Sequence, residues 1–136
     1  MMVTIDGPAG AGKSTTANLL LRYYDLTSGS ITIGNKSINQ IDLTGLRQNI
    51  GLVSQDPFLF DATVRENLLL AKPNASDHDI WKSLEMASAK EFVEALPAQE
   101  NTMLGERGIR LSMGEKQRIT LARALLKDPP IIILDE

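Results

Sequence analysis

The 136-residue sequence contains no cysteine, a single histidine and no apolar stretch long enough to cross a bilayer. Without cysteine the chain can form neither a disulfide framework nor a thiolate metal site, which agrees with a reducing cytosol. Without a spanning segment, any attachment to a membrane must run through a partner. The net charge of −3 shows no excess of the positive charge that attracts nucleic acid, so we expect no nucleic-acid partner. We interpret the one basic cluster, Arg107, Arg110, Lys116 and Arg118, as a solvated helix face.

The first sixty residues predict the elements of an α/β core. A short apolar stretch over residues 2–6 leads into a glycine-rich loop, and helix formers follow over residues 14–24. Residues 30–38 alternate around Gly34-Asn35, a pair that tolerates the positive φ of a tight turn, and predict a β-hairpin. Asp42 can cap a short helix over residues 43–48, and a buried strand is expected over residues 50–54.

The middle of the chain is rich in helix starts. Four Ser/Thr-x-x-Asp/Glu capping boxes are present: Thr63 with Glu66, Ser76 with Asp79, Ser88 with Glu91, and Ser112 with Glu115. The last box opens a long helix that ends near Lys127, and residues 131–134 form a β-branched run of the kind that is buried on both faces of a sheet. We therefore predict a three-layer core from residues 1–60 and 112–136, with a helical subdomain, residues 61–111, inserted in it. His78 is expected at the surface.

The most informative motif lies between the first predicted strand and helix. It reads Gly7-Pro8-Ala9-Gly10-Ala11-Gly12-Lys13-Ser14 and fits the P-loop pattern G-x-x-x-x-G-K-S. Glycines let successive N–H groups point at phosphate oxygens, and the helix start adds a positive dipole end. Lys13 would reach the β and γ phosphates, and Ser14 would ligate Mg²⁺. With Thr15 counted among the nucleotide-binding residues, the motif predicts ATP and Mg²⁺ as cofactors.

Two carboxylates follow the apolar run at the end of the chain. Asp135 is expected to hold Mg²⁺ through water, and Glu136 is expected to orient and deprotonate the attacking water. Four apolar residues before Asp-Glu are a weak signal alone, because a solvated strand end has the same pattern. Paired with the P-loop, the motif indicates a nucleoside-triphosphate hydrolase.

A third motif narrows the class. Leu111-Ser112-Met113-Gly114-Glu115 resembles the Leu-Ser-Gly-Gly-Gln-like signature that opens a helix in ABC ATPases, shortly before their acidic strand. Val53-Ser54-Gln55-Asp56 resembles the Q-loop of that family, and Gly105-Glu106-Arg107-Gly108 resembles a loop of its exporters. The resemblance covers essentially the whole chain.

The resemblance implies the ATP-binding and hydrolysing part of an exporter, on the cytoplasmic side of the membrane and attached through a membrane-spanning partner or fused domain. Ser112 and Gly114 would act on ATP that is held by the second subunit of a head-to-tail dimer. Gln55 would contact Mg²⁺ or the lytic water and would sense the transmembrane partner. Lys13, Gln55 and Glu136 are thus the expected catalytic residues.

The chain departs from the family pattern at several points. Met113 replaces a signature glycine and Glu115 a glutamine, and both changes are expected to weaken contact with a γ-phosphate. No aromatic residue precedes the P-loop to stack on adenine. The sequence stops at Glu136, before the family's D-loop, switch histidine and next central strand. We therefore expect a fragment whose sheet is incomplete, with turnover only in the complete domain and its dimer.

Other functions stay open at this point. Residues 5–14 also resemble the start of a cytidylate-type nucleotide kinase, although a kinase has no reason to possess Leu111 to Glu115. The chain could equally bind nucleotide without turnover. An ABC ATPase of DNA repair or translation is opposed by the net charge and by the exporter-like loop.

Overall fold

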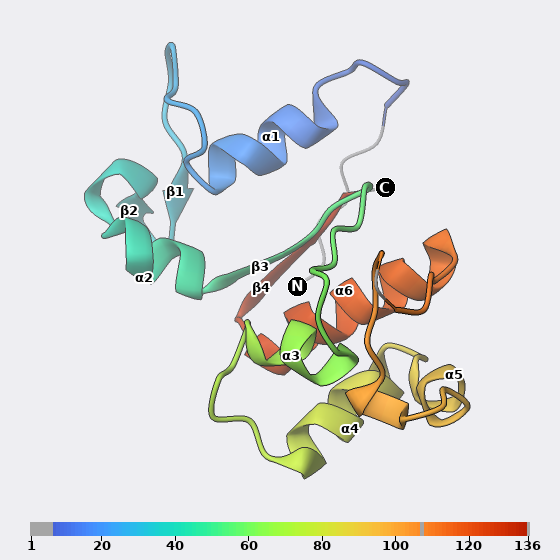
Figure 1. The fold of residues 1–136 in the computed structure, drawn as a ribbon. Helices are drawn as coiled ribbons and strands as arrows, with labels where there is room; N and C mark the ends of the chain where they lie inside the picture. The colour runs from blue at the N-terminus through green and yellow to red at the C-terminus, as the bar shows by residue number, and fades with distance from the viewer. Residues whose placement is uncertain (1–6, 107, 136) are drawn as a thin grey trace.

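A two-stranded parallel sheet lies at the centre of the chain, between two groups of helices (Figure 1). Its strands are β3 (Ile50–Val53) and β4 (Ile131–Leu134), paired from Ile50 beside Ile131 to Val53 beside Leu134. The structure, a computed structural model, describes residues 7–106 and 108–135. The strand predicted over residues 2–6, together with Arg107 and Glu136, lies outside the described residues.

The other elements form two groups about this sheet. The first comprises α1 (Lys13–Leu20), β1 (Thr32–Ile33), β2 (Lys36–Ser37), a 3₁₀ turn (Ile38–Gln40) and α2 (Leu43–Gln48). The second comprises α3 (Val64–Leu69), α4 (Asp77–Met86), α5 (Lys90–Glu94), a 3₁₀ turn (Gln99–Asn101) and α6 (Met113–Lys127). With α1 on one side of the sheet and α6 on the other, the three predicted layers are present (Figure 1). Within the described ranges, no helix is long and apolar enough to cross a membrane.

Each group has its own hydrophobic core. On the side of α1, the buried residues are Leu21, Ile38, Leu46 and Ile50. On the other side, a larger core joins α6 to the three helices before it through Val64, Leu68, Ile80, Leu84, Ala87, Ala89, Val93, Leu104, Ile119, Ala122 and Leu126. The helices of residues 61–111 therefore share their core with α6. The division into two subdomains stays a prediction.

Several local predictions are confirmed. The hairpin turns at Gly34 and Asn35, whose φ values are 55° and 65°. Asp42 accepts a hydrogen bond from the Gly45 amide and caps α2. Capping boxes open α3, α4 and α6 as predicted, and His78 is exposed.

The box predicted at Ser88 with Glu91 is wrong. Helix α5 begins after Ala89 and has no side-chain cap, whereas Ser88 adopts a left-handed conformation with φ 54°. The Ser88 amide donates to the Glu85 carbonyl, and the Ala89 amide donates to the Leu84 carbonyl. These two bonds form a Schellman motif, so Ser88 closes α4 and cannot open the next helix.

The first helix is shorter than predicted, because it ends at Leu20 and not near residue 24. Arg22 has a left-handed φ of 51°, and the Arg22 and Tyr23 amides close the helix on the Leu19 and Asn18 carbonyls. The Arg22 guanidinium donates to the carbonyls of Ile38 and Ile41. Contacts with the segment after the hairpin thus stop the helix where its composition alone would continue it.

The prediction that β4 is buried on both faces is wrong. Ile131 and Ile133 pack into the core beside α1, whereas Ile132 and Leu134 are 39% and 58% exposed. Helix α6 covers the neighbouring strand, where a Cβ on Gly51 would lie 3.6 Å from Ala124 Cβ. Among the described residues β4 pairs with β3 alone.

Candidate functional site

The P-loop forms an open helix start. Gly12 precedes α1 with φ 93°, Gly10 has φ 82°, and the Ala11 amide donates to the Pro8 carbonyl at 3.1 Å. Helix α1 has no side-chain cap and no acidic residue in its first turn. Its first N–H groups and its positive dipole end are therefore available to an anion.

Lys13 lies over this loop. Its Nζ donates to the Gly7 carbonyl at 2.7 Å and to the Pro8 carbonyl at 3.2 Å. The lysine is the first residue of α1, and its side chain returns across the loop that precedes the helix. A cation placed in this way can neutralise the phosphate groups that the loop amides would bind.

Two of the three predicted metal ligands, Ser14 and Asp135, are in contact. The Ser14 hydroxyl donates to Asp135 Oδ1 at 3.0 Å, across 121 residues of sequence. Asp135 follows the last residue of β4, and its amide donates to the Val53 carbonyl at 2.9 Å, which extends the pairing with β3 to the carboxylate. The first turn of α1 and the end of β4 are thus in direct contact.

The chemistry of the two side chains fits magnesium. A hydroxyl and a carboxylate are hard oxygen ligands, and Mg²⁺ in nucleotide sites typically takes one or two such ligands with water and phosphate oxygens. Within residues 7–106 and 108–135, no cluster of three or more His, Cys, Asp or Glu residues is placed to hold a metal without the nucleotide. Ser14 and Asp135 therefore suit a cation that arrives with phosphate.

Gln55 lies two residues beyond the end of β3, at the same sheet edge as Asp135. Both residues line a cavity of about 580 Å³, together with Val53, Ser54, Gly114, Gln117, Arg118, Leu121 and Leu134. The predicted polar residues of the two strand ends thus share one cavity with the first turn of α6. Glu136, the predicted base, lies outside the described residues.

The start of α6 differs from that of α1, because its own side chains close it. The Ser112 amide and hydroxyl both donate to Glu115 Oε2 at 2.8 Å, and the Glu115 amide donates to Ser112 Oγ at 3.3 Å. The hydrogen bonds from Ser112 hold the pKa of Glu115 below its usual value, and the Arg118 charge acts in the same direction. Glu115 is therefore a carboxylate at neutral pH.

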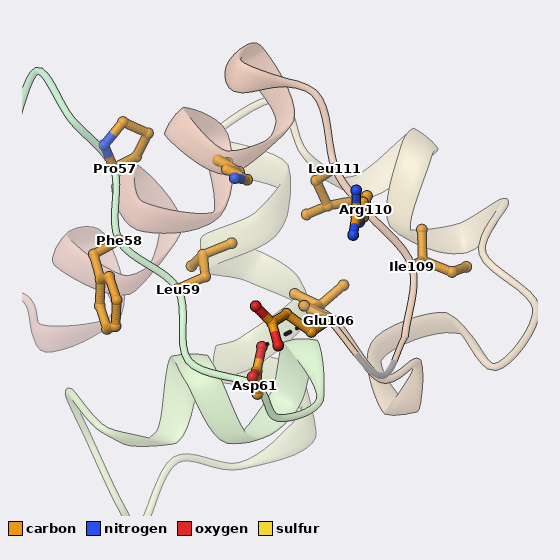
Figure 2. Close-up of a pocket in the computed structure, with 11 residues that line it drawn as sticks. Pro57, Phe58, Leu59, Asp61, Glu106, Ile109, Arg110 and Leu111 are labelled. Atoms are coloured by element: carbon orange, nitrogen blue, oxygen red, sulfur yellow. Dashed lines mark hydrogen bonds between the residues drawn. The ribbon is translucent and has the colours of Figure 1, made fainter.

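A second cavity, of about 480 Å³, lies between the segment after Gln55 and the exporter-like loop (Figure 2). Asp61 Oδ1 accepts a hydrogen bond from the Glu106 amide at 3.2 Å and ties the two segments together. A Cβ on Gly105, whose φ is 93°, would lie 1.7 Å from Asp61 Oδ1. Position 105 therefore requires glycine for its conformation and for space.

Sequence reasoning missed two residues of this region. Asp61 carries no motif that would reveal its contact with a loop 45 residues away. Arg123 of α6 donates to the Phe58 carbonyl at 3.0 Å, and burial lowers the pKa of its guanidinium. That bond holds the segment carrying Phe58 and Phe60, two exposed aromatic rings in edge contact with centroids 4.9 Å apart.

Comparison with known proteins gives one consistent result. The sequence profile of the family described as "ABC transporter" matches residues 1–136. ABC transporter B family member 4 of Dictyostelium discoideum is 49% identical over 135 residues, which are 99% of this chain and 18% of that protein. The ABC transporter ATP-binding protein YwjA of Bacillus subtilis (strain 168) is 48% identical over 134 residues, 98% of this chain and 23% of that protein.

Two further matches are informative. A Staphylococcus aureus (strain NCTC 8325 / PS 47) ATP-binding/permease protein, provisionally assigned to multidrug export, is 48% identical over 98% of this chain and 23% of its own length. A solved bacterial Atm1-family ABC exporter with ATP bound matches with a TM-score of 0.89 and 43% identity, over 95% of this chain and 23% of that chain. The chain thus spans about a fifth of the length of these proteins.

Proposed function

This chain belongs to the ABC transporter family, and from that premise we propose that it binds MgATP on the loop from Gly7 to Ser14 and forms part of the ATP-hydrolysing machinery of an exporter. The observation that carries the proposal is the contact of Ser14 with Asp135, beside a lysine that lies over the loop. A P-loop NTPase fold, which the likeness to a solved ABC exporter implies, provides this arrangement.

In the proposed mechanism the chain acts mainly by positioning charge. The loop amides and the α1 dipole bind the phosphates, and Lys13 moves from the Gly7 and Pro8 carbonyls to phosphate oxygens. Ser14 and Asp135 would hold Mg²⁺, which neutralises the phosphate oxygens when bound. Gln55 would orient water from the same sheet edge. The role of general base stays with Glu136, by resemblance to the family.

The proposed partners are a transmembrane part and a second ATP-binding domain in a head-to-tail dimer, at the cytoplasmic side of the membrane. The first is supported by the relative that combines ATP-binding and permease functions. We propose that the transmembrane part contacts the region of the second cavity, because Phe58 and Phe60 are exposed there close in sequence to Gln55. In the dimer, Ser112 and Gly114 would face the nucleotide of the other subunit.

We propose that the chain as it stands binds nucleotide without sustained turnover. The carboxylate of Asp135 is carried by a strand with two exposed apolar side chains, Ile132 and Leu134, and such a strand is weakly supported. The alternative of a nucleotide kinase is not favoured, because the matched family and the relatives named above are ABC transporters.

Titration calorimetry of the chain with MgATP tests the proposal. Lys13→Ala should weaken binding by about tenfold to a hundredfold, as expected for the loss of charge-assisted hydrogen bonds. Lys36→Ala is the matched control, since Lys36 is an exposed lysine of the hairpin, and it should leave affinity unchanged. Equal affinities for all three proteins would refute P-loop binding.

The same experiment tests whether ATP binding requires Mg²⁺. Chelation of Mg²⁺ should weaken ATP binding by the unmodified chain, whereas Asp135→Asn should bind ATP weakly in both conditions, because it lacks the carboxylate that holds the cation. Phosphorylation of CMP by the unmodified chain, absent in Lys13→Ala, would instead establish the kinase alternative.

A further inference from the structure

Three hydrogen bonds between Ser112 and Glu115 close the capping box of α6. In α3 and α4, the carboxylate accepts from the cap residue's amide, and the cap hydroxyl accepts from the third helical amide. In α6 the Ser112 hydroxyl also donates to the Glu115 carboxylate, at 2.8 Å. The Oε2 atom of Glu115 therefore collects two hydrogen bonds at 2.8 Å and is fixed over the first turn.

This arrangement has a chemical consequence for anions. A serine hydroxyl has one proton to donate, and here Glu115 accepts it, so it is not available to a phosphate oxygen. The carboxylate also places a negative charge at the positive end of the α6 dipole, where an incoming phosphate would be repelled. The space beside Gly114 is open, because a Cβ there would have no atom within 4 Å.

We propose that Glu115 is an internal competitor for the start of α6: its carboxylate occupies the Ser112 hydroxyl and determines how readily this helix accepts phosphate. The inference rests on the proposed function, in which Ser112 and Gly114 face the nucleotide of a second subunit. In this proposal Glu115 determines the specificity of the contact between the start of α6 and that nucleotide. The helix start accepts phosphate only when the carboxylate is displaced or neutralised.

The test uses the 136-residue chain with Lys13→Ala, so that binding at the P-loop is suppressed. Inorganic pyrophosphate is titrated at constant ionic strength, and the amide NMR signals of Met113 and Gly114 are followed. Glu115→Gln in this background should respond at roughly tenfold lower pyrophosphate than the parent, because a repelling charge is removed and the Ser112 hydroxyl is freed. Glu115→Asp, which keeps the charge, should stay close to the parent.

The matched control is Glu66→Gln, which makes the same change of charge in the capping box of α3. It should leave the Gly114 response at the parent value. The proposal is overturned if the parent and Glu115→Gln respond alike, including no response in either, or if Glu66→Gln gives the same gain. Binding at the P-loop is measured separately, by calorimetry with MgATP. If it fails, the chain with Lys13 binds MgATP no more tightly than Lys13→Ala.

Discussion

Helices α1 and α6 both begin in the region of the candidate site, but their starts are built in opposite ways. Gly12 precedes α1 without a side-chain cap, and the first turn carries no acid. Ser112 precedes α6 with a complete capping box, and Glu115 lies in its first turn. One helix start leaves its amides to a ligand, whereas the other satisfies them from its own chain.

The difference indicates that a helix N-terminus is more accessible to an anion when its own sequence leaves it open. A glycine at the cap gives up the stability of a side-chain cap, and a third helical residue without charge leaves the dipole end uncompensated. The P-loop has a glycine at the cap and no charge at the third helical residue, whereas α6 has neither feature. Variants that exchange these features between the two helix starts test the difference.

The largest effect is expected from closing the loop at Gly12. Gly12→Ala forces a side chain into a conformation with φ 93°, at a cost of about 1–2 kcal/mol, and should weaken MgATP binding at least tenfold. Gly29→Ala is the matched control, with φ 81° and equally open space. It should cost similar stability in urea denaturation but leave the calorimetric affinity unchanged. Equal loss of affinity in both would show that strain alone, and not the loop, controls binding.

A somewhat smaller effect is expected when α1 is given the acid of α6. Thr15 is exposed and is the third residue of α1, the position that Glu115 holds in α6. Thr15→Glu should weaken MgATP binding by roughly fivefold to tenfold through repulsion of the phosphates. Thr15→Gln, of the same size without charge, should bind several times more tightly than Thr15→Glu. Identical calorimetric affinities of the two variants would contradict the electrostatic account.

Removal of the α6 cap should affect stability and not binding at the P-loop. Ser112→Ala is expected to lower the free energy of unfolding by about 1 kcal/mol, the usual contribution of a capping side chain. Ser76→Ala removes the corresponding cap of α4 and should cost a similar amount. Urea denaturation measures both. A Lys13-dependent MgATP affinity that falls only in Ser112→Ala would mean that the two helix starts act on one nucleotide within one chain.

The smallest effect is expected from acid. Hydrogen bonds within the boxes lower the pKa of Glu66, Asp79 and Glu115. Their contribution to stability is therefore complete above the unfolded values, about 4.3 for Glu and 3.9 for Asp, and is lost as the pH falls through the lower folded values. Between about pH 5 and pH 3, around these pKa values, the protection factors of the first amides of α6 should fall, whereas those of α1, which has no acidic residue in its first turn, should not change. Simultaneous opening of both would contradict the difference between them.

Most local features of the fold could be predicted, because their signals are contained in a few neighbouring residues. The glycine-rich loop, the hairpin at Gly34-Asn35 and three capping boxes depend on short-range backbone geometry. The two errors in helix boundaries share one cause. Arg22 and Ser88 take left-handed conformations that close a preceding helix, and no periodicity of apolar residues reveals this.

Motifs in the sequence predict the members of the candidate site, and the structure adds how the described members are arranged. Lys13 Nζ donates to the Gly7 carbonyl and the Ser14 hydroxyl donates to Asp135, while the roles of these residues stay predictions. The Asp61 link to the Glu106 amide and the Arg123 link to the Phe58 carbonyl join segments 45 and 65 residues apart, with no local pattern to indicate them. The role of Glu136 stays a prediction.

The residue types alone indicate which groups are suited to bind phosphate, because the identity of a glycine, a lysine or a carboxylate sets its conformational range and its charge. Which of these groups meet depends on the tertiary structure. The parallel pairing of β3 with β4 places Asp135 against Ser14, and the folding of the first turn of α6 gives the Ser112 proton to Glu115. Distances of about 3 Å between groups 121 residues apart depend on the packing of the whole core, which no local pattern contains.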